Sequence, residues 1–254
     1  VDINLVPTPI NEIGIKGFGI EPPSTLEIAK VDKPQIIEEQ FGLKAGDVLT
    51  TINGEQIEHF WQFSEKLQSS FKPNVTLGFK RQGQNELIET EIAVQYSPAV
   101  VYRENGEFEP SHIYGLMPRL RIESIQLKEA NDVLRVGDVI LQINETANPS
   151  YRDLREHTQA SAGKEMRILV LRNGRNVEVK ITPKKGRDGR AVIGIIPVLD
   201  VNSTIAAQTV DVNNYRWPKD FAGNEILSIA GQDVRNYFDI ARVLNENRGK
   251  TVTV

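Results

Sequence analysis

The side chains that could carry out chemistry are few, because the chain has three histidines and no cysteine. The histidines are His59, His112 and His157, and no pair of them has the H-x-x-x-H spacing that places two zinc ligands on one helix face. Without cysteine there is no disulfide, thiolate nucleophile or sulfur ligand. We therefore predict neither a catalytic site nor a metal site within these residues.

Two short patterns imitate active-site motifs without the context that those motifs need. Ser161–Lys164 has the S-x-x-K spacing of Ser/Lys hydrolases. The corresponding segment after a later helical pattern, Asn247–Lys250, lacks the serine, so both are interpreted as glycine turns that end helices. Gly249–Thr251 imitates the end of a phosphate-binding loop, but Leu244 stands where that motif requires glycine. Neither pattern predicts a reaction.

Composition and charge narrow the range of partners. The 254 residues have a formal net charge of -4 and 39% hydrophobic side chains, which is typical of an ordinary globular chain. This balance gives no electrostatic reason to bind nucleic acid or an anionic membrane surface. No apolar run approaches the roughly 18 residues that a membrane-spanning helix needs. We expect no nucleic acid partner and no membrane contact by these residues.

One short phrase occurs three times and belongs to the elements that would position any site. It reads GDVLTTING at Gly46–Gly54, GDVILQINE at Gly137–Glu145 and GNEILSIAG at Gly223–Gly231. Asp47 and Asp138 follow a glycine at the start of an apolar run, where a carboxylate can accept nearby backbone N–H groups. The phrase therefore indicates a structural repeat of about 85 residues, long enough to bury its own core.

The residues around the phrase repeat as well. A Gly-apolar-x-Pro run precedes each copy, at Gly19–Pro22, Gly115–Pro118 and Gly194–Pro197. Apolar residues at helical spacing follow each copy. They predict helices near residues 59–70, 150–161 and 236–247. After the first two helices, alternating apolar residues around Gln82-Gly83 and Asn173-Gly174 predict hairpins.

The repeat predicts how the chain is divided. Val1–Pro7 resembles Val177–Pro183 in pattern, so we interpret it as the closing strand of an upstream repeat. We expect the chain to be a piece of a larger protein. Because Thr251–Val254 lacks its hairpin partner, we expect the third unit to leave ladder N–H and C=O groups unpaired and to be the least stable part. Alternatively, Val1–Pro7 of a neighbouring molecule fills that place. The expected divisions are a closing strand and linker at 1–16, a first unit at 17–97, a linker at 98–110, a second unit at 111–184, a linker at 185–191, and a third, C-terminally incomplete unit at 192–254.

The repeated unit resembles a PDZ domain, most closely over Gly42–Ile57, and its Gly-apolar lead run is similar to that of bacterial PDZ domains. The second unit resembles the family well, whereas the third departs from it at Asn224 and Ala230. The resemblance implies an α+β, mainly β fold. Each unit would be a partly open β-barrel with one or two helices.

The resemblance also implies a binding site between one strand and one helix, where an extended peptide or a protein C-terminus adds as a further strand. The implied peptide-binding residues are Gly19, Ile20, Phe60 and Ser64 in the first unit, Gly115, Leu116, Met117, Tyr151 and Arg155 in the second, and Gly194, Ile195, Tyr237 and Ala241 in the third. We expect the second unit to bind, with Arg155 favouring acidic peptides. Proline cannot donate to a strand ladder, so Pro118 would shorten the added strand if it faces the peptide and would have no effect if it faces away.

The arrangement is similar to the extracytoplasmic PDZ region of bacterial site-2-protease-type intramembrane zinc metalloproteases. That resemblance implies a substrate-filtering segment in the periplasm, with zinc held elsewhere in the membrane-embedded parent and no cofactor in these residues. The alternatives are the PDZ region of a periplasmic serine protease, of the high-temperature-requirement or C-terminal-processing type, and a PDZ scaffold without an enzyme. The flanking sequence would distinguish them.

Overall fold

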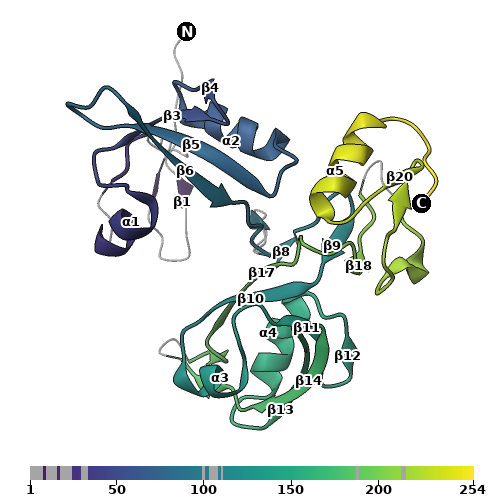
Figure 1. Ribbon diagram of the computed structural model, residues 1–254. Coiled ribbons are helices and arrows are strands. Elements are labelled where there is room, and N and C mark those ends of the chain that lie inside the picture. Colours follow the sequence, from purple (N-terminus) through teal and green to yellow (C-terminus); the bar gives the residue numbers. More distant parts are fainter. Residues whose placement is uncertain are drawn as a thin grey trace. The chain divides into compact units, whose positions relative to one another are not determined.

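The structure is a computed structural model, and it describes residues 8–9, 16–17, 25–29, 34–98, 101–102, 108–109, 111–186, 189–212 and 216–254. The chain forms two compact units, Val1–Ala93 and Val94–Val254. Short helices lie beside antiparallel strands in both units (Figure 1). This confirms the predicted α+β, mainly β fold.

The first unit is built on a four-stranded antiparallel sheet with the order β4-β3-β5-β6. Its buried side chains alternate along the central strand, where Val75, Leu77 and Phe79 lie in the core, as a half-buried strand requires. The elements are α1 (Pro34–Phe41), β3 (Val48–Ile52), β4 (Glu55–Gln56), α2 (Phe60–Ser69), β5 (Asn74–Lys80), β6 (Leu87–Ala93) and the pair β1 (Thr8–Pro9) and β2 (Lys16–Gly17).

The aspartate of the repeated phrase has a partner that the sequence analysis missed. Asp47 is buried and accepts two hydrogen bonds from the Arg81 guanidinium, at 2.8 and 2.7 Å, and one from the Lys44 N–H at 2.8 Å. Asp138 and Arg172 repeat the two guanidinium bonds at 2.8 and 2.7 Å. In both cases the arginine follows the aspartate by 34 residues. The paired charges fix the turn into β3 and its counterpart in the second unit.

The main sheet of the second unit follows the order β14-β13-β11-β10-β17, with β12 paired to β11. Its strands are β10 (Leu120–Ile125), β11 (Val139–Ile143), β12 (Thr146–Ala147), β13 (Met166–Arg172), β14 (Arg175–Ile181) and β17 (Ile195–Leu199). The other elements are β7 (Val101–Tyr102), β8 (Phe108–Glu109), β9 (Leu116–Pro118), α3 (Lys128–Val133), α4 (Tyr151–Ala160), β15 (Lys184–Lys185), β16 (Ala191–Val192), β18 (Ala206–Thr209), η1 (Lys219–Phe221), β19 (Ser228–Ile229), β20 (Gln232–Asp233) and α5 (Tyr237–Glu246).

The lead strands of the second and third sequence repeats are exchanged. The strand β17 begins the third repeat, but it pairs along β10 of the second, with Leu199 opposite Leu120 and Ile195 opposite Ile125. The strand β9 begins the second repeat, but it pairs with β18 of the third. Figure 1 shows β17 beside β10 and β9 beside β18. Each repeat therefore supplies a strand to the other.

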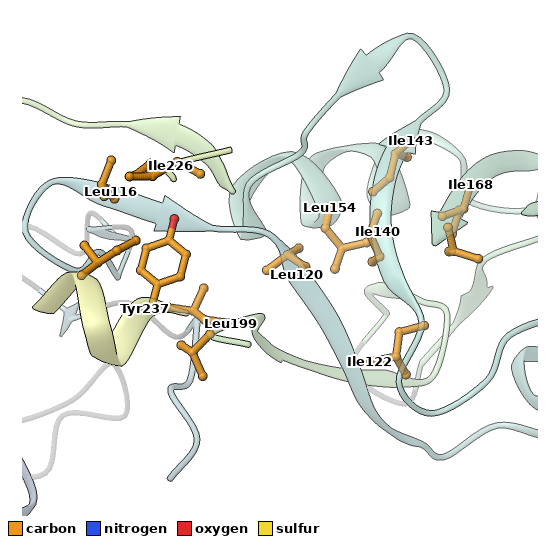
Figure 2. Close-up of a cluster of buried hydrophobic side chains, with 14 of the residues drawn as sticks. Leu116, Leu120, Ile122, Ile140, Ile143, Leu154, Ile168, Leu199, Ile226 and Tyr237 are labelled. Carbon is orange, nitrogen blue, oxygen red and sulfur yellow. The ribbon is translucent and has the colours of Figure 1, made fainter. Parts of the chain in front are cut away.

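The exchange produces one continuous antiparallel ribbon. Only Arg119 separates β9 from β10, and the Asp200 N–H, just after β17, donates to the Arg119 carbonyl at 2.7 Å. Side chains of both repeats then pack into a single hydrophobic cluster. Figure 2 shows part of it, with Leu116, Ile226, Tyr237 and Leu199 at one end and Leu120, Ile122, Ile140, Ile143, Leu154 and Ile168 continuing from them. The second and third repeats share one core.

The predicted helices are α2, α4 and α5, and each helix ends within one residue of its predicted bounds. The regions predicted as second and third units, 111–184 and 192–254, both lie in the second compact unit. The boundaries of the individual repeats stay predictions, and Val1–Pro7 lies outside the described residues. Thr251–Val254, predicted as a last strand, is not part of a strand, although the Ala230 N–H donates to the Thr253 carbonyl at 2.8 Å.

Candidate functional site

An open groove lies in the first unit, at the start of α2 and beside the segment 25–27. Its volume is about 980 Å³. Several large apolar side chains on its surface remain accessible, since Val48 is 37% exposed, Phe60 40% and Trp61 61%. Exposed apolar patches of this kind mark binding surfaces. The lining residues are Thr25, Leu26, Glu27, Val48, Glu58, His59, Phe60, Trp61, Ser64 and Glu65.

The helical wall of the groove is held at its first turn. The Gln62 side-chain oxygen accepts hydrogen bonds from the His59 N–H at 2.9 Å and the Glu58 N–H at 2.7 Å. These bonds satisfy two backbone N–H groups at the N-terminus of α2. Phe63 is half-buried, and its ring lies 5.8 Å from that of Phe60. Trp61 lies off this apolar stripe and therefore points to solvent.

The opposite wall is tied to the sheet through backbone bonds. The Leu49 N–H donates to the Leu26 carbonyl at 2.9 Å, and the Ile28 N–H donates to the Asp47 carbonyl at 2.8 Å. Glu27 forms an antiparallel bridge with Val48. Because Asp47 is anchored to the sheet by Arg81, as described above, the wall has a fixed position relative to β3.

The groove brings together two of the four predicted residues of the first unit. Phe60 and Ser64 both line it. Gly19 and Ile20 lie outside the described residues. Trp61 and the three glutamates that line the groove were not among the predicted binding residues. The break in helical spacing at Trp61 was the available signal, since Phe60, Phe63 and Leu67 already form the apolar stripe of the helix.

In the second repeat, the strand expected to receive a peptide already has a partner within the chain. Leu116 pairs with Thr209, Met117 with Gln208 and Pro118 with Ala206. The Gly115 carbonyl accepts a hydrogen bond from the Val210 N–H at 2.8 Å. Gly115, Leu116 and Met117 are all buried. The edge that would pair with a ligand is thus occupied by β18.

The helix of the second repeat is also connected to the strand region beside it. Gln159 at the end of α4 donates its side-chain amide to the Ala191 carbonyl at 2.7 Å and accepts from the Ala191 N–H at 3.0 Å. An amide side chain that bonds both backbone groups of one residue takes the place of a neighbouring strand there. Tyr151 and Arg155 on the same helix are half-buried.

In the third repeat, the two predicted helix residues are buried, and the two predicted strand residues, Gly194 and Ile195, are half-buried. Tyr237 is 1% exposed and Ala241 8%, because this face of α5 packs into the shared core. The Gly194 carbonyl accepts from the Gln126 N–H at 2.7 Å, and Ile195 pairs with Ile125. The expectation that Tyr237 and Ala241 face an open groove is therefore corrected, since the exchanged strands bury the face that they occupy.

A second cavity, of about 1090 Å³, lies in the second unit beside the end of α5. Trp217 and Phe221 contribute two rings to it that are tilted by 47° with centroids 5.2 Å apart, and the Trp217 indole N–H donates to the Tyr114 carbonyl at 2.8 Å. Arg216, Arg248 and Lys250 give it a basic lining. Its surroundings do not match the strand-and-helix geometry expected for peptide addition.

Two general findings apply to the part of the chain that the structure describes. No group of three or more histidine, aspartate or glutamate side chains is placed so that it could hold a metal ion. Among the same residues, no helix combines the length and the apolar character required to cross a membrane.

Comparisons with known proteins agree with the geometry of the first unit. Residues 39–81 match the family model of the PDZ domain. The regulator of sigma E protease from Haemophilus influenzae is 25% identical over 190 residues, which cover 70% of this chain and 40% of the relative. This chain thus spans less than half the length of that curated relative.

Among solved structures, the PDZ domain of an SdrC-like protein from Listeria monocytogenes is 21% identical, with a TM-score of 0.30. The matched region covers 35% of the chain described here and 92% of the Listeria domain. The family match lies within the first unit and includes Asp47, β3, β4, α2 and Arg81. The resemblance to PDZ domains that the repeated phrase predicted is thereby confirmed.

Proposed function

We propose that the chain is a non-catalytic peptide-binding region whose ligand-accepting site is the groove of the first unit. An extended peptide or protein C-terminus would lie along α2 and use Phe60 and Ser64 as side-chain contacts. The second compact unit, which contains the second and third repeats, would act mainly as a rigid body, because β9 pairs with β18 and β10 pairs with β17. This proposal differs from our sequence-based expectation that the second repeat is the one that binds.

One observation carries the proposal, namely how exposed the equivalent helix position is in each repeat. Phe60 is 40% exposed, Tyr151 is half-buried and Tyr237 is 1% exposed. A ligand can reach an aromatic side chain only where it is accessible, so the first unit offers the best surface. The exposed Trp61 adds apolar area beside it. Aromatic side chains of this kind often dominate binding energy.

For the parent protein, we propose a regulatory, substrate-filtering role in a site-2-protease-type zinc metalloprotease, with this region outside the cytoplasm. The support is the relative described as a regulator of sigma E protease. Zinc would belong to the parent and not to this region. The relative gives no support to the alternatives of a serine protease or a scaffold without an enzyme.

The binding proposal can be tested by titrating the ¹⁵N-labelled 254-residue chain with a library of peptides that end in a free carboxylate. We expect amide shifts near Phe60 and Ser64, and dissociation constants in the high micromolar to millimolar range. A few added-strand hydrogen bonds of about 1 kcal/mol each, in a groove open to solvent, give only weak affinity. Tyr237 and Ala241 should not shift, because the core encloses them.

A matched pair of variants provides the control. Phe60→Ala should weaken binding, whereas Leu87→Ala, which removes another exposed apolar side chain of the first unit away from the groove, should not. Shifts that cluster at Gly115 and Tyr151 instead would contradict the proposal and favour a site in the second unit.

A further inference from the structure

The rim of the first unit's groove is acidic, and its carboxylates have no ion-pair partner among the residues that the structure describes. Glu27, Glu58 and Glu65 are the charged carboxylates among its lining residues, and no lysine or arginine lines it. None of the three forms an ion pair with any residue in the described ranges. Other glutamates of the same unit do pair, for example Glu38 with Lys44. Within the described ranges, the groove therefore presents a negative field that no ion pair cancels.

An exposed aromatic ring, that of Trp61, lines the same groove as these carboxylates. Trp61 and Glu65 are four residues apart on α2, which places them on one face of the helix. Glu58 precedes the N-cap residue His59. The Trp61 ring lies nearly parallel to that of His59, with centroids 6.2 Å apart. Lysine and arginine side chains are attracted to the face of a tryptophan, and carboxylates that line the same groove strengthen that preference.

We propose that the groove selects an extended segment in which lysine or arginine flanks apolar side chains. The apolar side chains would cover Phe60 and Val48, and the cation would lie over Trp61 between Glu58 and Glu65. An acidic segment would meet repulsion from these carboxylates. This inference rests on the proposed function, since it specifies the ligand of the same groove. It also reverses the charge preference expected from Arg155 in the second repeat.

The test uses the full 254-residue chain and three ten-residue peptides with identical apolar positions and a free C-terminal carboxylate. They differ only at two flanking positions, which are lysine, glutamine or glutamate. We expect the lysine peptide to bind roughly fivefold more tightly than the glutamine peptide, as two solvent-exposed ion pairs would allow. The glutamate peptide should bind more weakly than both. Raising the salt concentration should narrow these differences, because added ions screen exposed charges.

Variants that remove charges from the rim test whether the preference for the lysine peptide comes from these glutamates. In the double variant Glu58→Gln and Glu65→Gln, the lysine peptide should bind no better than the glutamine peptide. The matched control is Glu39→Gln with Glu89→Gln, which removes two exposed charges of the same unit that do not line the groove. The control should keep the preference for lysine, so any loss in the first variant is not an effect of net charge.

The outcomes separate this inference from the function on which it rests. Equal binding of all three peptides, with shifts at Phe60 and Ser64, would overturn the cationic preference and leave peptide binding intact. Tighter binding of the glutamate peptide at the same residues would also overturn it. Absence of shifts at Phe60 and Ser64 for every peptide would overturn both proposals.

Discussion

At the scale of single residues, the repeated phrase is explained by its aspartate. The pKa of Asp47 is held below its ordinary value, mainly by the side-chain hydrogen bonds from Arg81, against the opposing effect of burial. The ionised carboxylate is therefore favoured in the folded state. Because Asp138 and Arg172 reproduce the same two bonds, the phrase preserves a paired charge at the entry to a strand, and it does so away from the groove.

Replacing this aspartate gives a prediction for stability. Asp47→Ala should lower the free energy of unfolding of the first unit by about 2–4 kcal/mol at pH 7, since it leaves the partners of a buried carboxylate unsatisfied. A folded-state pKa below the unfolded value means that the contribution of Asp47 is complete above the unfolded pKa of about 3.9 and is lost as pH falls through the folded value. The difference between wild type and variant should therefore shrink on acidification.

Denaturant unfolding between pH 7 and pH 2 measures this difference. Asp220→Ala, which replaces an exposed aspartate of the second unit, serves as the control and should show a small effect at every pH. A difference for Asp47→Ala that grows as the pH falls would contradict the assigned pairing.

At the scale of elements, the sequence predicted the helices well and the strand partners poorly. The positions of α2, α4 and α5 follow from apolar spacing, which is a local property. The lead strands β9 and β17 have the Gly-apolar-x-Pro pattern whether they pair within their own repeat or with the other one. Sequence pattern reports which face of a strand is buried, but not which neighbour it pairs with. The sequence pattern therefore could not predict the exchange of lead strands, nor that the exchange fills two of the expected grooves.

The turn before β17 gives a prediction at this scale. Gly194 has φ +71, and a Cβ added to it would lie 2.3 Å from the Cγ of Leu127. Gly194→Ala should therefore destabilise the second unit by about 2–4 kcal/mol, because backbone strain adds to overpacking. Gly249 also has a positive φ, of +79, but an added Cβ would meet nothing within 4 Å. Gly249→Ala should lower stability by only about 1 kcal/mol.

Thermal unfolding of the two glycine variants under identical conditions compares them directly. Equal destabilisation would show that the close approach to Leu127 contributes nothing, and it would weaken the assignment of β17 beside β10.

At the scale of the whole molecule, the three sequence repeats are packed in two different ways. The first unit has its own core and keeps its groove accessible. The second and third repeats are joined by the ribbon of β9, β10, β17 and β18 and by a common core. Segments that share buried side chains and strand ladders unfold together. Similar sequences thus form a unit with an open groove at one place and an interlocked structural unit at another.

This interlocking predicts how a defect in one repeat spreads. Leu199 on β17 is 4% exposed and lies opposite Leu120, so Leu199→Ala should cost about 2–4 kcal/mol through loss of buried surface and the cavity that remains. Native-state hydrogen exchange should show equal loss of protection in β13 of the second repeat and in α5 of the third, with β5 of the first unit unchanged. The matched substitution Leu77→Ala, at a residue 6% exposed, should lower protection in β5 and leave β13 and α5 unchanged. If Leu199→Ala instead weakens only β13 or only α5, the two repeats open separately. The exchanged strands would then be a contact between independent units, and the rigid role proposed for the second unit would fail.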